Sequence, residues 1–201
     1  MDNNNEFNNG ITETNDSNIK VYNDFDDMGL DDDLLRGICS YGFEKPSGIQ
    51  SRAIVPIIGG KDIIAQSQSG TGKTATFLIS TLQRVDKDMK SPQVLVLTPN
   101  RELSIQIHEV LKSLNQFCGI SSTTIIGGTK VEDDFKTLDN GVQYIIGTPG
   151  RVFDMIKRYA LKTDHLKSFV LDEADEMLSR GFKDQIYEIF QYVPKTSQIC
   201  L

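Results

Sequence analysis

Cysteine is scarce in this 201-residue sequence, and the spacing of the few cysteines is informative. Cys39, Cys118 and Cys200 lie far apart and form no C-x-x-C pair. That spacing excludes a zinc site or disulfide framework of the usual kind and indicates reduced, buried thiols in an intracellular protein. No apolar run approaches the length of a membrane span, and the N-terminus MDNNNEFNNG lacks the basic and apolar regions of a secretory signal.

Basic residues are also in the minority, and the net charge is -7. This weighs against a strongly basic nucleic-acid-binding protein, although a small groove needs only a local basic patch. Hydrophobic residues make up 38% and charged residues 24%, which is typical of a globular protein with room for one α/β domain. Residues 1–20 are rich in Asn and poor in apolar side chains, so we expect a flexible tail before a domain spanning 21–201.

The stretch AQSQSGTGKT, residues 65–74, has the pattern of a phosphate-binding loop. Gly70 and Gly72 allow the backbone N–H groups to converge, and the helix expected from Lys73 adds its positive dipole end. Lys73 is placed to reach the β- and γ-phosphates, and Thr74 to offer a hydroxyl to Mg²⁺. Ser67 stands where the general pattern has Gly, so the match is to the variant A-x-x-G-x-G-K-T.

Apolar runs that alternate with helical spacing predict a parallel sheet with helices on both faces. The expected strands are 62–64, 94–97, 123–126, 144–146 and 169–171, with a last apolar run at 199–201. The expected helices are 31–41, 46–57, 73–82, 103–114, 152–156 and 186–193. Each strand ends in a polar or glycine-rich turn, and parallel strands present these turns at one edge, where ligands bind.

Four of those turns suggest a chemical role. Asp172 follows an apolar strand and is placed to hold Mg²⁺ opposite Thr74, while Glu173 can orient or deprotonate an attacking water. The alternative is a plain acidic turn that starts a helix. Arg101 and Arg151, with the unhindered backbones of Gly127-Gly128 and Gly150, suit a phosphodiester chain, and the alternative for the arginines is salt bridging with acidic neighbours. Pattern alone makes Gln50 a solvated polar residue.

Several motifs together resemble a known family. They are Phe25, GFEKPSGIQ (42–50), AQSQSGTGKT (65–74), PNRELS (99–104), Gly127-Gly128, TPGR (148–151) and DEAD (172–175). In this order they resemble the first RecA-like domain of the DEAD-box RNA helicases. VFDMIKR (152–158) and VLDEADEMLSRGFKDQIY (170–187) look most similar to the eukaryotic initiation factor four A group. The resemblance implies a RecA-like three-layer α/β fold of the P-loop NTPase class, with ATP and Mg²⁺ as cofactors.

The resemblance also implies residue roles. Gln50 would read the adenine edge, Phe43 would stack on the adenine and Phe25 would support that pocket. The other nucleotide-binding positions would be Pro46, Ser69, Gly70, Thr71, Gly72, Lys73 and Thr74. Lys73, Asp172 and Glu173 would be catalytic, Thr74 and Asp172 would hold the metal, and Asp175 would link the site to neighbouring motifs. The RNA sugar-phosphate backbone would contact Pro99, Arg101, Gly128, Thr148, Gly150 and Arg151.

The sequence departs from the family at Asn100 and Ser104, where Thr and Ala are usual. The S-A-T motif expected after SQICL and the second RecA-like domain with its arginine fingers are not in these 201 residues, so we expect a fragment with negligible ATP hydrolysis of its own.

Three functions fit these observations. The first is an RNA-dependent ATPase of the helicase type, acting in translation initiation or mRNA processing. The second is an ATP-locked RNA clamp with little turnover. The third is another phosphate-loop enzyme, such as a GTPase, although no N-K-x-D guanine reader is present. The resemblance implies RNA and a scaffold of the four-G type or exon-junction proteins as partners, a monomer without membrane contact, and a cytoplasmic or nuclear location.

Overall fold

A computed structural model describes residues 19–68, 70–179 and 181–201 of the chain. Its centre is a five-stranded sheet in the order β2-β3-β1-β4-β5, and all of the strand pairs are parallel. The strands are β1 Val94–Leu97, β2 Ser122–Ile125, β3 Tyr144–Gly147, β4 Ser168–Leu171 and β5 Gln198–Cys200. The expected α/β architecture is therefore confirmed, with β1 between β3 and β4.

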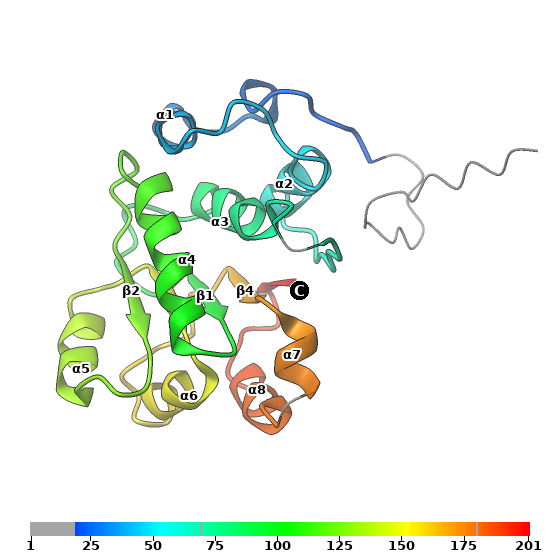
Figure 1. Ribbon diagram of the computed structural model, residues 1–201. Helices are drawn as coiled ribbons and strands as arrows, with labels where there is room; N and C mark the ends of the chain where they lie inside the picture. The colour runs from blue at the N-terminus through cyan, green and yellow to red at the C-terminus, as the bar shows by residue number, and fades with distance from the viewer. Residues whose placement is uncertain (1–18, 69, 180) are drawn as a thin grey trace, which may run out of the picture.

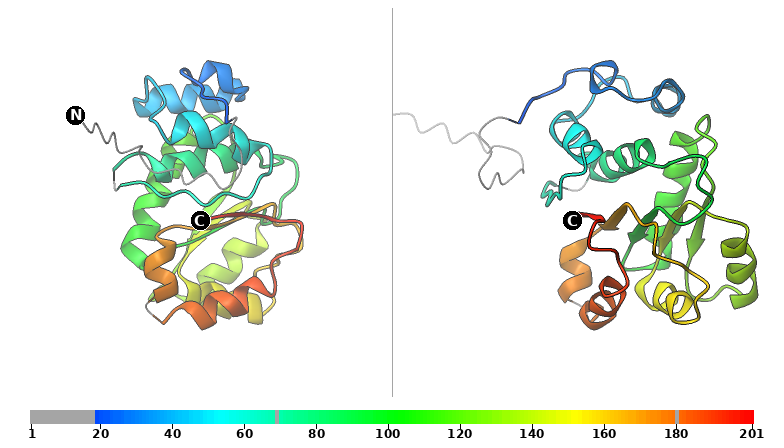
Figure 2. Two further views of the ribbon diagram at one scale, coloured as in Figure 1. Left: turned by 90° about the vertical axis from the view of Figure 1, so that its right-hand side faces the viewer. Right: turned by 180° about the vertical axis from the view of Figure 1, so that it is seen from behind.

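Helices cover both faces of the sheet (Figures 1 and 2). They are η1 Asp26–Met28, α1 Asp32–Tyr41, α2 Gln50–Ile58, α3 Lys73–Gln83, α4 Arg101–Leu114, α5 Val131–Asp139, α6 Pro149–Lys157, α7 Ala174–Ser179 and α8 Lys183–Phe190. The first four α-helices pack on one face and the last four on the other, which gives three layers. No helix in the described ranges combines the length and the apolar character needed to cross a membrane.

The apolar strands explain why two helical layers are needed. In β1, Val94 and Val96 belong to the core beneath α1–α4, whereas Leu95 and Leu97 belong to the core beneath α5–α8. All four side chains are 0% exposed, because successive strand residues point to opposite faces. An uninterrupted apolar run is the sequence signature of such a strand.

The register brings the ends of the strands to one edge. Leu97 lies beside both Gly147 and Leu171, and Ile125 lies beside Gly147. The backbone N–H of Thr98 then donates to the carbonyl of Gly147, and that of Asp172 donates to the carbonyl of Leu97, each at 3.0 Å. The polar turns after these strands therefore start side by side, as the sequence predicts.

The structure differs from the predicted elements in several places. Helix α2 begins at Gln50, not at Pro46, and residues 46–49 form a turn whose Ser47 carbonyl accepts from the N–H of Ser51 at 2.8 Å. The expected strand 62–64 is a single parallel bridge between Ile63 and Cys200.

Helix α5 was not predicted, because its first turn is acidic and only Asp134 and Leu138 are buried. Helix α7 was not predicted either, because its first turn is also acidic and its one buried residue is Met177. Cys118 and Cys200 are buried as expected, whereas the expected burial of Cys39 was wrong, since this thiol is exposed near the end of α1. The expected tail lies almost wholly outside the described residues.

Candidate functional site

The loop at residues 65–74 leads from the edge of the sheet into α3, as expected. Gly70 has φ 81° and Gly72, the N-cap of α3, has φ 97°, a left-handed conformation that glycine adopts without strain. Ser67, which replaces the usual Gly, shares a 2.6 Å hydrogen bond with the hydroxyl of Thr71, and that hydroxyl donates to the Gln68 carbonyl at 2.8 Å. Ser69 lies outside the described residues.

Lys73, the first residue of α3, points back across this loop. Its Nζ donates to the carbonyl oxygen of Ser67 at 2.8 Å. The ammonium group therefore holds the two ends of the loop together at the place where the helix dipole is positive. An anion that enters the loop would replace the Ser67 carbonyl as the partner of Lys73.

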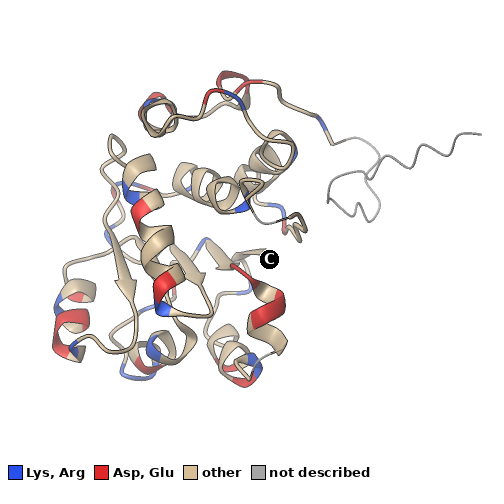
Figure 3. Cartoon of the chain, in the orientation of Figure 1, with Lys and Arg blue, Asp and Glu red and all other residues tan. Residues whose placement is uncertain are grey.

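Beside the loop lies a cavity of about 390 Å³. Its charged lining comes from Lys73, Asp172, Glu173 and Asp175, while Ile64 and Leu178 are among its apolar residues. Lys73 and Asp172 thus meet at one site although they lie far apart in the sequence. Figure 3 shows the acidic residues gathered at the start of α7, at the edge where the phosphate loop also lies.

Asp172 directly follows the last residue of β4 and lines the cavity. It is 9% exposed, and its backbone N–H is tied to β1. Burial, reinforced by the neighbouring charge of Glu173, raises the pKa of the Asp172 carboxyl to about 6, and Lys73 opposes part of that rise. A bound cation would restore the charged form, so this carboxylate suits a divalent metal.

Glu173 has a left-handed backbone, with φ 55°. This conformation is uncommon for a residue with a side chain and costs on the order of 1–3 kcal/mol. Helix α7 begins at the next residue, Ala174, so the strained turn separates β4 from the helix and leaves Glu173 exposed. The acidic turn that starts a helix is therefore present, and it also lines the cavity. The sequence carries no signal for the positive φ.

The residues present fit a magnesium ion held jointly with phosphates. Within the described ranges, no group of three or more His, Cys, Asp or Glu could hold a metal by itself. Mg²⁺ with a nucleotide needs only one or two protein carboxylates, because phosphates and waters complete its shell. Asp172 offers such a group, and Thr74 follows Lys73 in α3, although Thr74 is not among the residues that line the cavity.

Gln50 is buried, at 3% exposure, so its interpretation as a solvated residue was wrong. Its Oε1 accepts from the backbone N–H of Ser47 at 2.8 Å, and its Nε2 donates to the carbonyl of Gly72 at 3.5 Å. A Cβ on Gly72 would lie 2.7 Å from that Nε2. The turn at 46–49 is therefore joined to the phosphate loop through one amide.

Aromatic residues lie on the same N-terminal segment. The rings of Phe25 and Phe43 are stacked with centroids 6.4 Å apart, and Phe25 is 4% exposed while Phe43 and Pro46 are half-buried. Tyr41, which the sequence patterns did not single out, lies 4.8 Å from Phe43. These aromatic residues do not line the cavity beside Lys73. The structure thus places Phe25 against Phe43, and the roles of both residues at an adenine pocket stay predictions.

The turn after β1 carries Pro99 and Arg101. Pro99 is buried, and Asn100 is the N-cap of α4, with its Oδ1 accepting from the N–H of Leu103 at 2.9 Å. Arg101 is exposed and lies against Gly128, since a Cβ on Gly128 would lie 2.2 Å from the Arg101 Nη1. The structure therefore brings two predicted RNA-contacting positions together.

The two departures from the family pattern share one network. Ser104 is 0% exposed, and its hydroxyl lies 2.6 Å from that of Thr98. The carbonyl oxygen of Asn100 lies 3.2 Å from the Ser104 hydroxyl and 3.0 Å from that of Thr98, so one hydroxyl donates to the other, which in turn donates to this carbonyl. The serine is thus fully satisfied in a place where an alanine would also fit.

The turn after β3 carries Thr148, Gly150 and Arg151. Thr148 is the N-cap of α6, and Gly150 is exposed. Arg151 forms an ion pair with Asp134 at 3.2 Å, and both side chains are under 10% exposed. No ion pair of Arg101 is found among the described residues. Salt bridging is therefore confirmed for Arg151 and not for Arg101, and its partner Asp134 was not identified from the sequence.

A parallel sheet with a glycine-rich loop, a lysine at a helix start and an acidic strand end defines a P-loop NTPase of the RecA-like type. The DEAD/DEAH box helicase family matches residues 47–201, and the chain belongs to that family. An ATP-dependent RNA helicase eIF4A of Phaeosphaeria nodorum is 59% identical over 88% of this chain and 45% of its own length. One from Coccidioides immitis is 54% identical over 96% of this chain and 50% of its own length. The chain therefore spans about half the length of these curated relatives.

Solved structures agree with the fold. A DEAD box protein from the hyperthermophile Methanococcus jannaschii is 36% identical with a TM-score of 0.86, over 90% of this chain and 50% of that chain. Dbp5 of S. cerevisiae, solved bound to RNA and ADP BeF3, is 39% identical with a TM-score of 0.82, over 90% of this chain and 46% of that chain. The RecA-like assignment is therefore confirmed, and family membership excludes the unrelated phosphate-loop enzymes as an alternative.

Proposed function

We propose that this chain is the ATP-binding half of an ATP-dependent RNA helicase of the initiation factor four A type. The observation that carries this is the meeting of Lys73, Asp172 and Glu173 around one cavity at the carboxyl edge of the sheet. The relatives named eIF4A, at 54–60% identity, favour translation initiation over the alternative of an ATP-locked RNA clamp.

The proposed mechanism assigns one task to each side chain. Lys73 would exchange the Ser67 carbonyl for phosphate oxygens, with the N–H groups of residues 70–74 and the α3 dipole beside it. Mg²⁺, held by Asp172 and Thr74, would supply the charge that neutralises the phosphates. Glu173 would hold the attacking water, and its exposed position leaves room for it. Gln50 would recognise the adenine edge while its Nε2 donates to the carbonyl of Gly72 in the phosphate loop.

The proposed RNA surface is formed by the exposed Arg101, Gly128 and Gly150 and the half-buried Thr148, with the buried Pro99 in the same turn as Arg101. Its open backbone groups and one exposed guanidinium suit a sugar-phosphate chain, and they read no base. We include Arg151 in this surface as a brace for the turn, because its guanidinium is already occupied by protein partners. RNA and a scaffold protein of the four-G type remain the proposed partners, in the cytoplasm or nucleus.

The test is RNA-stimulated ATP hydrolysis by the full-length protein that contains this chain, with Lys73→Ala as the variant. We expect the variant to lose hydrolysis while keeping its fold. ATP hydrolysis equal to that of the unmodified protein would contradict the assignment. Hydrolysis that depends on GTP and not on ATP would contradict the role of Gln50.

A further inference from the structure

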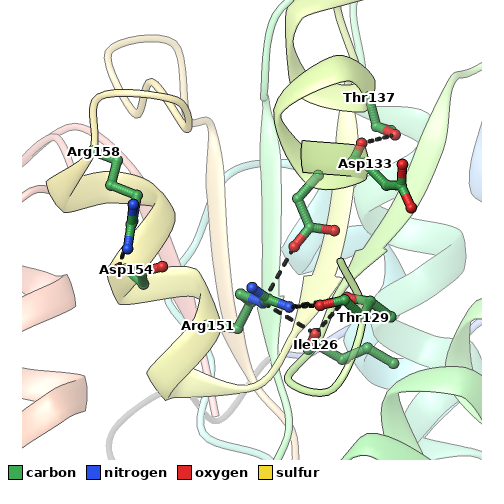
Figure 4. A network of polar contacts seen from close by, with 8 residues as sticks. Ile126, Thr129, Asp133, Thr137, Arg151, Asp154 and Arg158 are labelled. Atoms are coloured by element: carbon green, nitrogen blue, oxygen red, sulfur yellow. Dashed lines mark hydrogen bonds and ion pairs between the residues drawn. The ribbon is translucent and has the colours of Figure 1, made fainter. Parts of the chain in front are cut away.

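Asp134 and Arg151 form a buried ion pair that no motif accounts for. Asp134 lies on α5 and Arg151 on the first turn of α6, and their side chains are 8% and 9% exposed. The carboxylate Oδ2 and the guanidinium Nε are 3.2 Å apart. Figure 4 shows Arg151 reaching across from α6 to the start of α5. A buried pair is costly to form, so it is best explained by what it positions.

The rest of the Arg151 guanidinium holds the turn between β2 and α5. Its Nε donates its one hydrogen to the carbonyl of Ile126 at 3.2 Å, so Asp134 Oδ2 faces this nitrogen as an ion pair without a hydrogen bond. Its Nη2 donates to the carbonyl and the hydroxyl of Thr129, the latter at 3.1 Å. The Thr129 hydroxyl in turn donates to the Ile126 carbonyl at 2.9 Å. Both ends of residues 126–129 are therefore fastened to one rigid, planar cation, as Figure 4 shows.

The fastened turn carries Gly128, which has φ 86° and lies against Arg101. The turn therefore contacts the exposed Arg101 guanidinium through Gly128. A continuous chain of contacts thus connects Asp134 to Arg151, Arg151 to the turn, and the turn to Arg101. The nearby pair of Arg158 and Asp154 has no such chain of contacts, since it is an exposed contact at the C-terminal end of α6, with side chains 54% and 39% exposed.

We infer that Asp134 is a positioning residue for the RNA-binding edge: by orienting Arg151, it fixes the 126–129 turn and thereby the placement of Gly128 and Arg101. This inference rests on the proposed function, because it assumes that Arg101 and Gly128 meet the RNA backbone. It gives Asp134 a role in RNA affinity although its side chain is too buried to touch RNA. It also makes Arg151 a brace within the protein.

A first experiment needs no RNA. Asp134→Asn keeps the size of the side chain and removes its charge, and Arg151→Lys keeps the charge and removes the planar fork. We expect either change to speed hydrogen exchange at the amides of residues 127–130 by about tenfold, because the turn opens locally. The matched control is Asp154→Asn, which should leave those amides unchanged. Equal protection in Asp134→Asn and Asp154→Asn would overturn the inference.

A second experiment measures binding of a fluorescent single-stranded oligouridine at several salt concentrations. Arg101→Ala should weaken binding and lower the slope of log affinity against log salt by about one. Asp134→Asn should do the same, and adding Arg101→Ala to it should cause little further loss, because the two changes disable one contact. Rescue by Asp134→Glu would support a requirement for the carboxylate.

The outcomes separate the inference from the proposed function. If Arg101→Ala leaves RNA affinity and its salt slope unchanged, the proposed RNA surface is wrong. If Arg101→Ala weakens binding but the effect of Asp134→Asn is absent or fully additive, the inference alone is overturned. Stronger RNA binding by Asp134→Asn would also overturn it, because Asp134 would then be masking the charge of Arg151 and not positioning Arg101.

Discussion

The ammonium group of Lys73 and the carbonyl oxygen of Ser67 are joined by a 2.8 Å hydrogen bond that closes the phosphate loop on itself. The lysine is thus placed by the protein before any ligand arrives. On the proposed function, a nucleotide would break this bond and would offer phosphate oxygens, which form stronger, charge-assisted bonds in its place. The loop would then exchange an internal contact for a ligand contact without leaving the ammonium group unpaired.

Lys73→Ala should weaken ATP binding by more than about tenfold, since a charge-assisted contact with the phosphates is lost. The fold should remain, because the residue gives up one hydrogen bond at a loop. Titration with a fluorescent ATP analogue and thermal unfolding would measure both effects. Lys112→Ala is a matched control, as this exposed lysine forms an ion pair with Glu109 on α4 at 2.6 Å and does not line the cavity. Unchanged ATP affinity in the Lys73 variant would contradict the assigned role.

Gln50→Ala should weaken ATP more than inorganic tripolyphosphate, because only ATP carries the base that the amide is proposed to read. Competition of both ligands against a fluorescent nucleotide would measure the two affinities. Gln83→Ala removes a similar amide, bonded to Asp31 at the end of α3 opposite to the phosphate loop, and should change neither affinity. Equal weakening of both ligands would mean that Gln50 acts only through its contact with Gly72.

Asp172→Asn should stabilise the nucleotide-free protein at neutral pH and abolish magnesium-dependent ATP binding. The folded-state pKa of Asp172 is raised to about 6, above the ordinary 3.8, so the folded protein holds this proton more tightly than the unfolded chain. The stability that this proton provides is present below about pH 4 and lost as the pH rises to about 6. An asparagine does not ionise, so the side chain that replaces Asp172 in the variant causes no such loss of stability. Above that pH window the free energy of unfolding of Asp172→Asn should therefore exceed that of the unmodified protein by at most about 3 kcal/mol.

Urea unfolding of both proteins on either side of that window would measure this difference. Asp175→Asn serves as the control, because it removes an exposed carboxylate from the same cavity. A stability difference that does not grow between about pH 4 and about pH 6 would contradict the role of Asp172 burial.

The sheet and its functional edge could be predicted from the sequence because the physical signals are local. The run Val94–Leu97 is apolar throughout, and the glycines and the lysine of the phosphate loop follow one another directly. Chain geometry then places every strand end at the same edge. Pattern alone suggested roles for the phosphate loop, for Asp172-Glu173 and for the turns with Arg101 and Arg151. All other residue roles came from the resemblance to the family.

The parts that could not be predicted depend on contacts between distant segments. The local sequence predicts a solvated side chain at Gln50, but the packing of α2 against the phosphate loop buries that side chain. The sequence around Arg151 indicates a side chain available for a ligand, but in the fold Asp134 on α5 pairs with it. The first turn of α5 contains three acidic residues, and the sequence does not indicate that Asp134 is the buried one. The left-handed backbone of Glu173 has no sequence signal, since it is imposed by the junction of β4 with α7.

Asn100 offers a last prediction, because it replaces the usual threonine of the family at a helix N-cap. Its Oδ1 accepts from the N–H of Leu103 at 2.9 Å, a bond that threonine can also make and alanine cannot. Asn100→Ala should therefore lower the free energy of unfolding by about 1 kcal/mol, and Asn100→Thr by only a few tenths. Urea unfolding would measure both. If Asn100→Thr were as destabilising as Asn100→Ala, the cap would not explain why asparagine is tolerated, and the contacts of its carbonyl with Thr98 and Ser104 would have to carry that explanation.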